Sequence, residues 1–428
     1  MKKQMILYLL ILAGSVSLYA QSDKKEQTFT LKEAIDYALS SNYGQQILEI
    51  SKAGTKEEVA QSKRDLLPDL QGSVSQSYSN NGNNGSYNLN TSMTLWKGGQ
   101  QMNAIKRAKV AYSQSDSKII QAQNNLMIDI IQAYLSVIMN EELLEYQKSV
   151  AAISKEMMNQ GQIRYRAGEI LESDYLLLQA QYTSDSYALT NSEINRDNAL
   201  LDLKKLLCIN PDTPVKVEHP QSFSLEALAL PPLNTVIEQT LAWLPDLQIT
   251  SRNIDLAELD VKIARGGYSP TLSLNGSIGT NYNGTGNGSW GSQFNDNLMQ
   301  QVSVSISVPL WNKGKTRSNV KQANFRLQQA QLEDAQTELN LVTSLEKEYL
   351  NVTSLREKYQ AAQISNEAYA ENFRVFTTKF DKGAVSTTDL LQQQNSYLNA
   401  LNNYIQSKYS YWFNRKMIDV YMGNEINN

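Results

Sequence analysis

The sequence predicts a mainly α-helical chain built from one unit that occurs twice, each copy contributing a strand hairpin to a sheet in a membrane. Three observations predict this fold. The two halves of the chain keep register over long intervals, four segments alternate between apolar and polar residues, and two long intervals without proline have the spacing of packed helices.

Residues 1–20, "MKKQMILYLLILAGSVSLYA", have the layout of a cleaved secretory signal, with two lysines, an apolar run and then small residues ending at Ala20. The alternative is an N-terminal membrane anchor, but the apolar run is shorter than the roughly 20 residues of a spanning helix. No later stretch approaches ~18 consecutive apolar residues. The mature chain can therefore cross a membrane only as strands.

The repeat covers most of the remaining chain. Trp96 and Trp311 are 215 residues apart (311 − 96), and Gly168 and Gly383 have the same separation (383 − 168). Upstream, the offset is 202 residues (270 − 68, two matching prolines), so the second copy carries an insertion, "NYNGTGNGSWGSQ", whose composition predicts a loop. The expected organisation is a first repeat, a proline-rich linker, a second repeat and a tail: 21–210, 211–232, 233–420 and 421–428.

Four segments have the alternation of strands, at about 69–80, 86–96, 270–282 and 300–311. In the last of them Val302, Val304 and Ile306 alternate with serines, and the apolar row of the second segment ends with Met93 and Leu95. Alternation over roughly 10 residues is typical of outer-membrane strands. A soluble, half-buried sheet is the alternative.

Four strands cannot close a barrel by themselves, because single-chain outer-membrane barrels begin at eight strands. An open sheet in lipid leaves the backbone groups of its edge strands unpaired. If the strands lie in lipid, the chain must oligomerise, and twelve strands from three chains are one closed solution. Trp96 and Trp311 end the second strand of each hairpin, where an interfacial aromatic belt is expected at the junction with the helices.

The intervals from Gly99 to Gly168 and from Gly314 to Gly383 predict long helices. In the first, apolar residues recur every seven positions, a spacing that predicts coiled-coil packing: Ile130, Val137, Leu144, Ala151 and Met158. About 70 helical residues extend on the order of 100 Å. A coiled-coil hairpin with a purely structural role has the same pattern.

Each long helix is followed by a matching turn, in which Gly168 or Gly383 ends one helix and an aspartate six residues later begins the next. Asp174 and Asp389 thus fall in a first helical turn, where the helix dipole favours a carboxylate, and Ser386 has capping-box spacing from Asp389. In a trimer, each aspartate also forms a ring of three carboxylates, which selects cations at a constriction. Both interpretations can hold together.

The composition excludes several classes of protein. The net charge of −4 offers no basic surface for nucleic acid. A single cysteine, Cys208, and a single histidine, His219, exclude a disulfide framework and a Cys/His zinc site within one chain. There is no nucleotide-binding motif and no nucleophile–base pair, so we expect no enzymatic activity, no catalytic residues, no cofactor and no metal.

Taken together, the duplicated "LW..G" joints, the "LxPxL" stretch at Leu66–Leu70 with its looser counterpart at Ser269–Leu272, and the paired "G…..D" turns resemble the TolC-like outer-membrane efflux proteins. The resemblance implies a signal peptide and a homotrimer. Each chain would give four strands to a 12-stranded β-barrel in outer-membrane lipid, continued by a periplasmic α-helical barrel. It also implies that the tips at Gly168 and Gly383 form the periplasmic entrance and contact a periplasmic adaptor (membrane fusion) protein.

The resemblance also suggests roles at the channel mouth. Asp389 looks like a ring acid, but the second acid of the ring is Gln392 here. Asp174 resembles an acid that locks the closed mouth against a Tyr and an Arg, positions that are Phe380 and Val385 in this sequence. The lock must then be weaker or use other residues, with Lys379 and Lys382 as the nearby candidates.

The resemblance therefore predicts an outer-membrane channel of a tripartite efflux system, a passive conduit that exports small molecules delivered by an adaptor and an inner-membrane pump of RND, ABC or MFS type. One alternative is the conduit of a type I protein secretion system. Another, from a different class, is a secreted coiled-coil adhesin or spacer.

Overall fold

A computed structural model describes residues 27–80, 82–219, 230–285 and 289–424 of the 428-residue chain. The chain forms two compact units. The sheet unit comprises Gly44–Asn124 and Leu233–Lys347, and the tip unit comprises Met1–Tyr43, Asn125–Pro232 and Glu348–Asn428. The predicted signal peptide and the centre of the predicted linker, residues 220–229, lie outside the described residues.

The helices repeat in length between the two halves, with 11, 22, 67 and 35 residues in each copy. The pairs are α2 (Leu31–Ser41) with α6 (Leu233–Trp243), α3 (Tyr43–Arg64) with α7 (Pro245–Gly266), α4 (Gln100–Arg166) with α9 (Lys315–Asp381), and α5 (Glu172–Leu206) with α10 (Thr387–Tyr421). At 1.5 Å per residue, α4 and α9 are each about 100 Å long. In the part of the chain that the structure describes, no helix is apolar over enough of its length to cross a bilayer.

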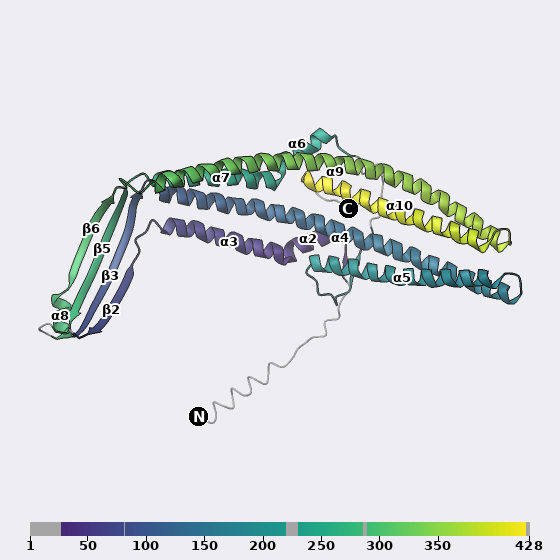
Figure 1. Ribbon diagram of the computed structural model, residues 1–428, viewed down its shortest axis with the longest axis horizontal. Coiled ribbons are helices and arrows are strands. Elements are labelled where there is room, and N and C mark those ends of the chain that lie inside the picture. The colour runs from purple at the N-terminus through teal and green to yellow at the C-terminus, as the bar shows by residue number, and fades with distance from the viewer. Residues whose placement is uncertain (1–26, 81, 220–229, 286–288, 425–428) are drawn as a thin grey trace, which may run out of the picture. The chain divides into compact units, whose positions relative to one another are not determined.

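The sheet unit contains one antiparallel sheet with the order β2-β3-β5-β6 (Figure 1). Its strands are β2 (Gln71–Ser79), β3 (Gly82–Lys97), β5 (Thr271–Asn283) and β6 (Met299–Ser307). Leu274 lies opposite Met93 on one side and Val304 on the other, while Asn275 lies opposite Ser92 and Ser303. Because paired residues share a face, the alternation in the sequence becomes one apolar and one polar face of the sheet.

Two details of the strands differ from the expectation. The register shifts between Thr94 and Trp96, so Trp96 rather than Leu95 lies opposite Leu272. This β-bulge inserts one residue and reverses the side chains that follow it. The strand expected to reach residue 311 ends at Ser307, and Trp311 lies outside it. Pro309, which has no N–H to donate, stands just beyond this end.

A short helix, α8 (Trp290–Asp296), begins within the predicted loop insertion, which corrects the expectation of a loop throughout. Ser289 caps it by accepting a hydrogen bond from the Ser292 N–H. The ring of Tyr87, on the apolar face, contacts Trp290 and Phe294 with centroids 6.2 and 5.9 Å apart. The helix therefore packs against this end of the apolar face.

In the sheet unit, α7 is held to the first part of α4 and of α9 by polar contacts. Gln114 of α4 donates to Asn253 at 2.7 Å, and Arg107 pairs with Asp260 at 2.7 Å. On the other side, Thr250 donates to Asp334 of α9. These contacts explain why glutamine and asparagine occupy positions where a soluble coiled coil would carry more aliphatic residues.

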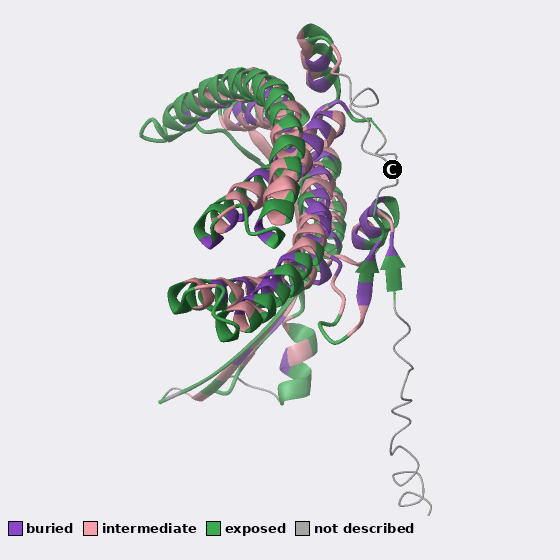
Figure 2. Cartoon of the chain, turned by 90° about the vertical axis from the view of Figure 1, so that its right-hand side faces the viewer, coloured by how far each residue is buried: buried purple, intermediate pink, exposed green. Residues whose placement is uncertain are grey.

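In the tip unit, the apolar core lies where α4, α5 and α10 meet, with Ile130, Ile131, Tyr134, Ile138 and Leu203 almost fully buried. The Tyr134 hydroxyl lies 2.7 Å from the Glu218 carbonyl oxygen and 3.0 Å from that of Phe29. This ties the predicted linker to the core, because Val215–Val217 forms β4, which pairs in parallel with β1 (Gln27–Phe29). Buried and exposed residues occur side by side along each long helix (Figure 2).

Candidate functional site

The two helical hairpins of the tip unit end in the same kind of turn. Gly168 has φ 77° and Gly383 has φ 70°, in the left-handed region that favours glycine. The Gly168 N–H donates to Tyr165 O at 3.0 Å and the Glu169 N–H to Arg164 O at 2.9 Å, which is a Schellman motif. The turn at Gly383 repeats this pattern. Both glycines thus lie at the turns, as their spacing predicts, and a Cβ added at either would meet no other atom within 4 Å.

Asp389 acts as a helix cap in the structure. Its N–H donates to Ser386 Oγ at 3.1 Å, and its carboxylate accepts from the Ser386 hydroxyl at 2.7 Å and from the Ser386 N–H at 3.3 Å. The capping box that the spacing suggested is therefore present at the start of α10. The carboxylate is also exposed, which leaves it available to solvent ions, and Gln392 is exposed one turn later.

Asp174 lies in the first turn of α5, where the N-cap residue, Leu171, supplies no side-chain hydrogen bond. Among the described residues, none donates a hydrogen bond to the Asp174 carboxylate or forms an ion pair with it. In the described part of the chain, neither Lys379 nor Lys382 forms a hydrogen bond or an ion pair with Asp174, and the side chains of Phe380 and Val385 have no polar group to offer it. Lys379 instead lies over the ring of Phe376, on its own helix, at 5.2 Å from the centroid.

A residue that the sequence did not indicate joins the two tips. Arg164, near the end of α4, donates to the Asp381 carbonyl oxygen at 3.1 Å and lies 3.5 Å from that of Phe380. Its guanidinium carbon is 5.5 Å from the centroid of the Phe380 ring. Phe380 in turn packs in a small apolar cluster with Met157, Leu178 and Leu390. We name Arg164, Phe380 and Asp381 the tip clasp.

The tip clasp has a simple electrostatic basis. The last carbonyl groups of α9 have no partner within the helix and carry the negative end of its dipole, so a cation there is favoured. Arg164 supplies this cation from the other hairpin. The only signal in the sequence is a basic residue one turn before Gly168, which is also expected of an ordinary helix end.

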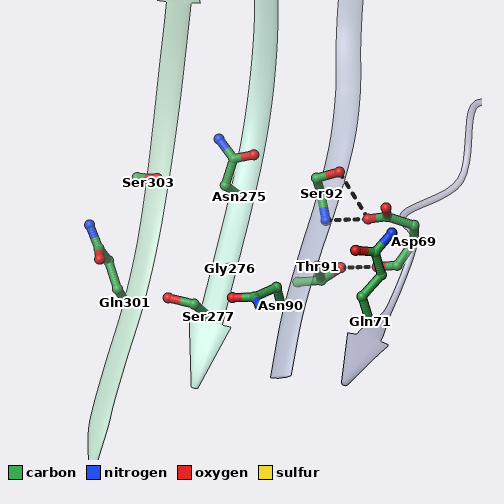
Figure 3. Close-up of a pocket in the computed structure, with 10 residues that line it drawn as sticks. All are labelled: Asp69, Gln71, Asn90, Thr91, Ser92, Asn275, Gly276, Ser277, Gln301 and Ser303. Atoms are coloured by element: carbon green, nitrogen blue, oxygen red, sulfur yellow. Dashed lines mark hydrogen bonds between the residues drawn. The ribbon is translucent and has the colours of Figure 1, made fainter. Parts of the chain in front are cut away.

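The second candidate region is the two-faced sheet. On one face, large apolar side chains are uncovered in the described chain: Val302, Val304 and Ile306 are 79%, 63% and 69% exposed. The opposite face carries Ser, Asn and Gln around a hollow of about 410 Å³ (Figure 3). Asp69 borders this hollow, and its carboxylate accepts from the N–H and the hydroxyl of Ser92 at 2.6 and 2.9 Å.

No charged residue lies within β2, β5 or β6, and β3 has only Lys97 at its end. An uncovered apolar face suits hydrocarbon, whereas a polar and uncharged face suits a water-filled lumen. Among the described residues, no group of three or more His, Cys, Asp or Glu side chains is arranged to hold a metal ion. The regions found are thus suited to a membrane wall and to the mouth of a passage, and they hold no cluster suited to a metal.

This combination of a two-faced sheet and paired long helical hairpins defines a class, the outer-membrane channel subunits. The solved outer membrane channel CmeC of Campylobacter jejuni has the same fold, with a TM-score of 0.78 over 92% of this chain and 85% of that one at 20% identity. The sequence model of the outer membrane efflux protein family matches residues 44–208 and 236–424. The chain belongs to this family, which confirms the resemblance drawn from the repeat.

Two relatives illustrate the range of the family. The chain is 25% identical to the outer membrane protein TolC of Escherichia coli (strain K12), over 82% of this chain and 74% of that protein. It is 23% identical to the proteases secretion protein PrtF of Dickeya chrysanthemi, over 91% of this chain and 87% of that protein. As a member of this family, the chain is an efflux channel of the outer membrane that extends into the periplasm.

Proposed function

We propose that three copies of the chain form a passive conduit for small molecules, in which the sheets close into one barrel and the hairpin tips form the periplasmic mouth. The observation that carries this proposal is the two-faced sheet. Its edge strands, β2 and β6, each pair with a strand on one side only, and their outer sides have no strand partner in the described chain. Unpaired edges are costly in lipid, so pairing β2 of one copy with β6 of the next satisfies both.

At the mouth, the proposal gives Asp389 and Asp174 the role of carboxylate rings, with Gln392 in place of a further acid. The exposed carboxylate of Asp389 and the unpaired carboxylate of Asp174 support this role. The turns at Gly168 and Gly383 would contact a periplasmic adaptor. Trp96 and Trp311 would mark the junction between barrel and helices, although Trp96 lies in a strand and Trp311 beyond one.

The energy for export would come from an inner-membrane pump of RND, ABC or MFS type, because we assign this chain no catalytic residues, cofactor or metal. Small molecules are the proposed cargo. Secretion of proteins is the second candidate, favoured by the similarity to a protease secretion protein. The adhesin or spacer alternative is disfavoured, because a spacer has no need of a sheet with an uncovered apolar face.

The deciding experiment is single-channel recording from the purified protein in a planar bilayer, with a salt gradient to read ion selectivity. Discrete current steps with a cation preference support the conduit. A confirmed trimer that gives no current, either alone or with the Arg164→Ala substitution meant to loosen its mouth, contradicts it and favours the spacer.

A further inference from the structure

A buried acid that neither the mouth nor the sheet uses lies on α5. Asp185 is 4% exposed. Its carboxylate accepts from the side-chain amides of Gln181, at 2.9 Å, and of Gln394 on α10, at 3.3 Å, and also interacts with the hydroxyl of Ser154 on α4. No Lys, Arg or His in the described part of the chain forms an ion pair with it. A buried ionised carboxylate without a cation is unfavourable.

One buried acceptor of the same cluster has no hydrogen-bond donor. Gln394 is 2% exposed, and its side-chain oxygen, Oε1, has no partner among the described residues. An ionised carboxylate can only accept hydrogen bonds, so it cannot satisfy this oxygen. A protonated carboxyl has one O–H to donate. Proton binding at Asp185 therefore supplies the donor that the side-chain oxygen of Gln394 lacks. It also neutralises the buried carboxylate.

We propose that Asp185 is a proton-binding site that joins the two helical hairpins of the tip unit. In the protonated form its carboxyl donates to Gln394 Oε1 while the amide of Gln394 donates back, so that α5 and α10 are held together by a paired contact. Asp185 lies 13 residues into α5 (185 − 172), about 20 Å behind the turn. The contact is therefore well separated from the tip clasp and from the acids of the mouth.

The surroundings agree with this assignment. Burial raises the pKa of the Asp185 carboxyl, and the hydrogen bonds to it only partly offset this effect. The titratable groups that face it are Tyr146 of α4 and Tyr397 of α10, whose rings meet edge to face with centroids 5.9 Å apart. Burial raises the pKa of both tyrosines, so both stay neutral. From α9, Phe373 stacks on Tyr397 and adds no charge.

The direction of the pH effect follows from linkage. When the hairpins separate, Asp185 becomes hydrated and its pKa returns to the usual value, so the joined state binds the proton more tightly. Joining is thus favoured as the pH falls through the raised pKa, and this advantage is lost as the pH rises above it. Between the two pKa values, the ratio of joined to separated states changes about tenfold per pH unit.

The first test is thermal unfolding of the full-length trimer between about pH 5 and pH 8, a range that brackets a raised carboxyl pKa. Asp185→Asn, which is neutral and carries a permanent donor, should melt at a higher temperature than the unchanged protein at the upper pH, with the difference shrinking as the pH falls. Glu193→Gln is the matched control, because it removes the same charge from an exposed site on the same helix. It should shift the melting temperature equally at every pH.

A constant or negative difference for Asp185→Asn across this range overturns the proposal. Gln394→Leu is the second variant, since it removes the partner and keeps the site apolar. At the lower pH, where Asp185 is protonated and makes the paired contact, Gln394→Leu should lower the melting temperature. If Gln394→Leu costs no stability at the lower pH, the proton does not join the two helices and the proposal fails.

The consequence for conduction rests on the proposed function. Bilayer recording, read beside the melting results, separates a failure of the proton site from a failure of the conduit. The open probability should fall as the periplasmic pH falls, and Asp185→Asn should keep it low at every pH. If the melting results hold but no variant conducts, the proton site stands and the conduit fails. If current flows but melting shows no effect of Asp185, the conduit stands and the proton site fails.

Discussion

Removing Arg164 should open the mouth, because this side chain makes the polar contacts of the tip clasp between the two hairpins. Its contacts are one hydrogen bond at 3.1 Å, a weaker one at 3.5 Å and a cation–π contact at 5.5 Å. A hydrogen bond to a charged group is worth about 1.5–3 kcal/mol and an exposed cation–π contact about 0.5–1 kcal/mol. Because Arg164 is half-exposed, we expect Arg164→Ala to cost the closed state about 2 kcal/mol per chain.

A loss of about 2 kcal/mol corresponds to a change of about 30-fold in the ratio of closed to open states for one chain. The assay is open probability from single-channel records of the full-length protein at fixed pH and salt. The open probability of Arg164→Lys should lie between those of the unchanged protein and of Arg164→Ala. Lysine keeps the charge but lacks the planar guanidinium group that reaches two carbonyl groups.

The matched control is Arg166→Ala, which removes the same charge from the same helix end at an exposed residue. It should leave the open probability within about twofold of the unchanged protein, as expected for a surface change. An equal increase for both alanine variants would mean that net charge matters and the contact does not. No increase for Arg164→Ala would refute the reasoning altogether.

Three further predictions follow from the sheet and the turns. Val304→Lys should prevent assembly in the outer membrane, because a lysine on the lipid face costs about 2–4 kcal/mol at mid-membrane. The control, Ser303→Lys on the polar face, should assemble. Membrane fractionation and trimer migration on gels report the outcome. Gly383→Ala should lower the free energy of unfolding by about 1 kcal/mol, through the positive φ alone, because nothing lies within 4 Å of an added Cβ. Gly383→Asn should lower it less, since asparagine adopts this conformation more readily. Thermal melting measures both. Asp389→Asn should weaken the cation preference, which is read from the reversal potential. Asp389→Ala should weaken it too and should also lose about 1 kcal/mol of stability, because the capping box is removed. An unchanged cation preference in both variants would leave Asp389 as a helix cap only.

The repeat predicted the helices well because helix bounds depend on local signals. The starts of α4 and α9 differ by 215 residues (315 − 100), the offset read from the matching tryptophans. Each of these helices ends two residues before a glycine with positive φ, a conformation that most other residues adopt only with strain. The two faces of the sheet also followed directly from alternation, because the side chains of a strand point to opposite sides in turn.

The candidate site was predicted less completely. Asp174, Asp389 and both tip glycines lie in the turns where their spacing puts them. Arg164 was missed, because its partners, Phe380 and Asp381, are more than 200 residues away in sequence. The β-bulge before Trp96 was also missed, since the extra residue is defined by the partner strand and leaves no local mark.

The sequence by itself determined the duplicated architecture, the long helices, the turns and the alternating strands, since each depends on contacts between neighbours a few residues apart. Only the tertiary structure decided that Arg164 caps the other hairpin and that Asp185 meets Gln394, which is 209 residues away. Such contacts depend on how whole helices lie against each other. A half-exposed arginine and a buried acid look like ordinary helix residues until the partner helix is in place.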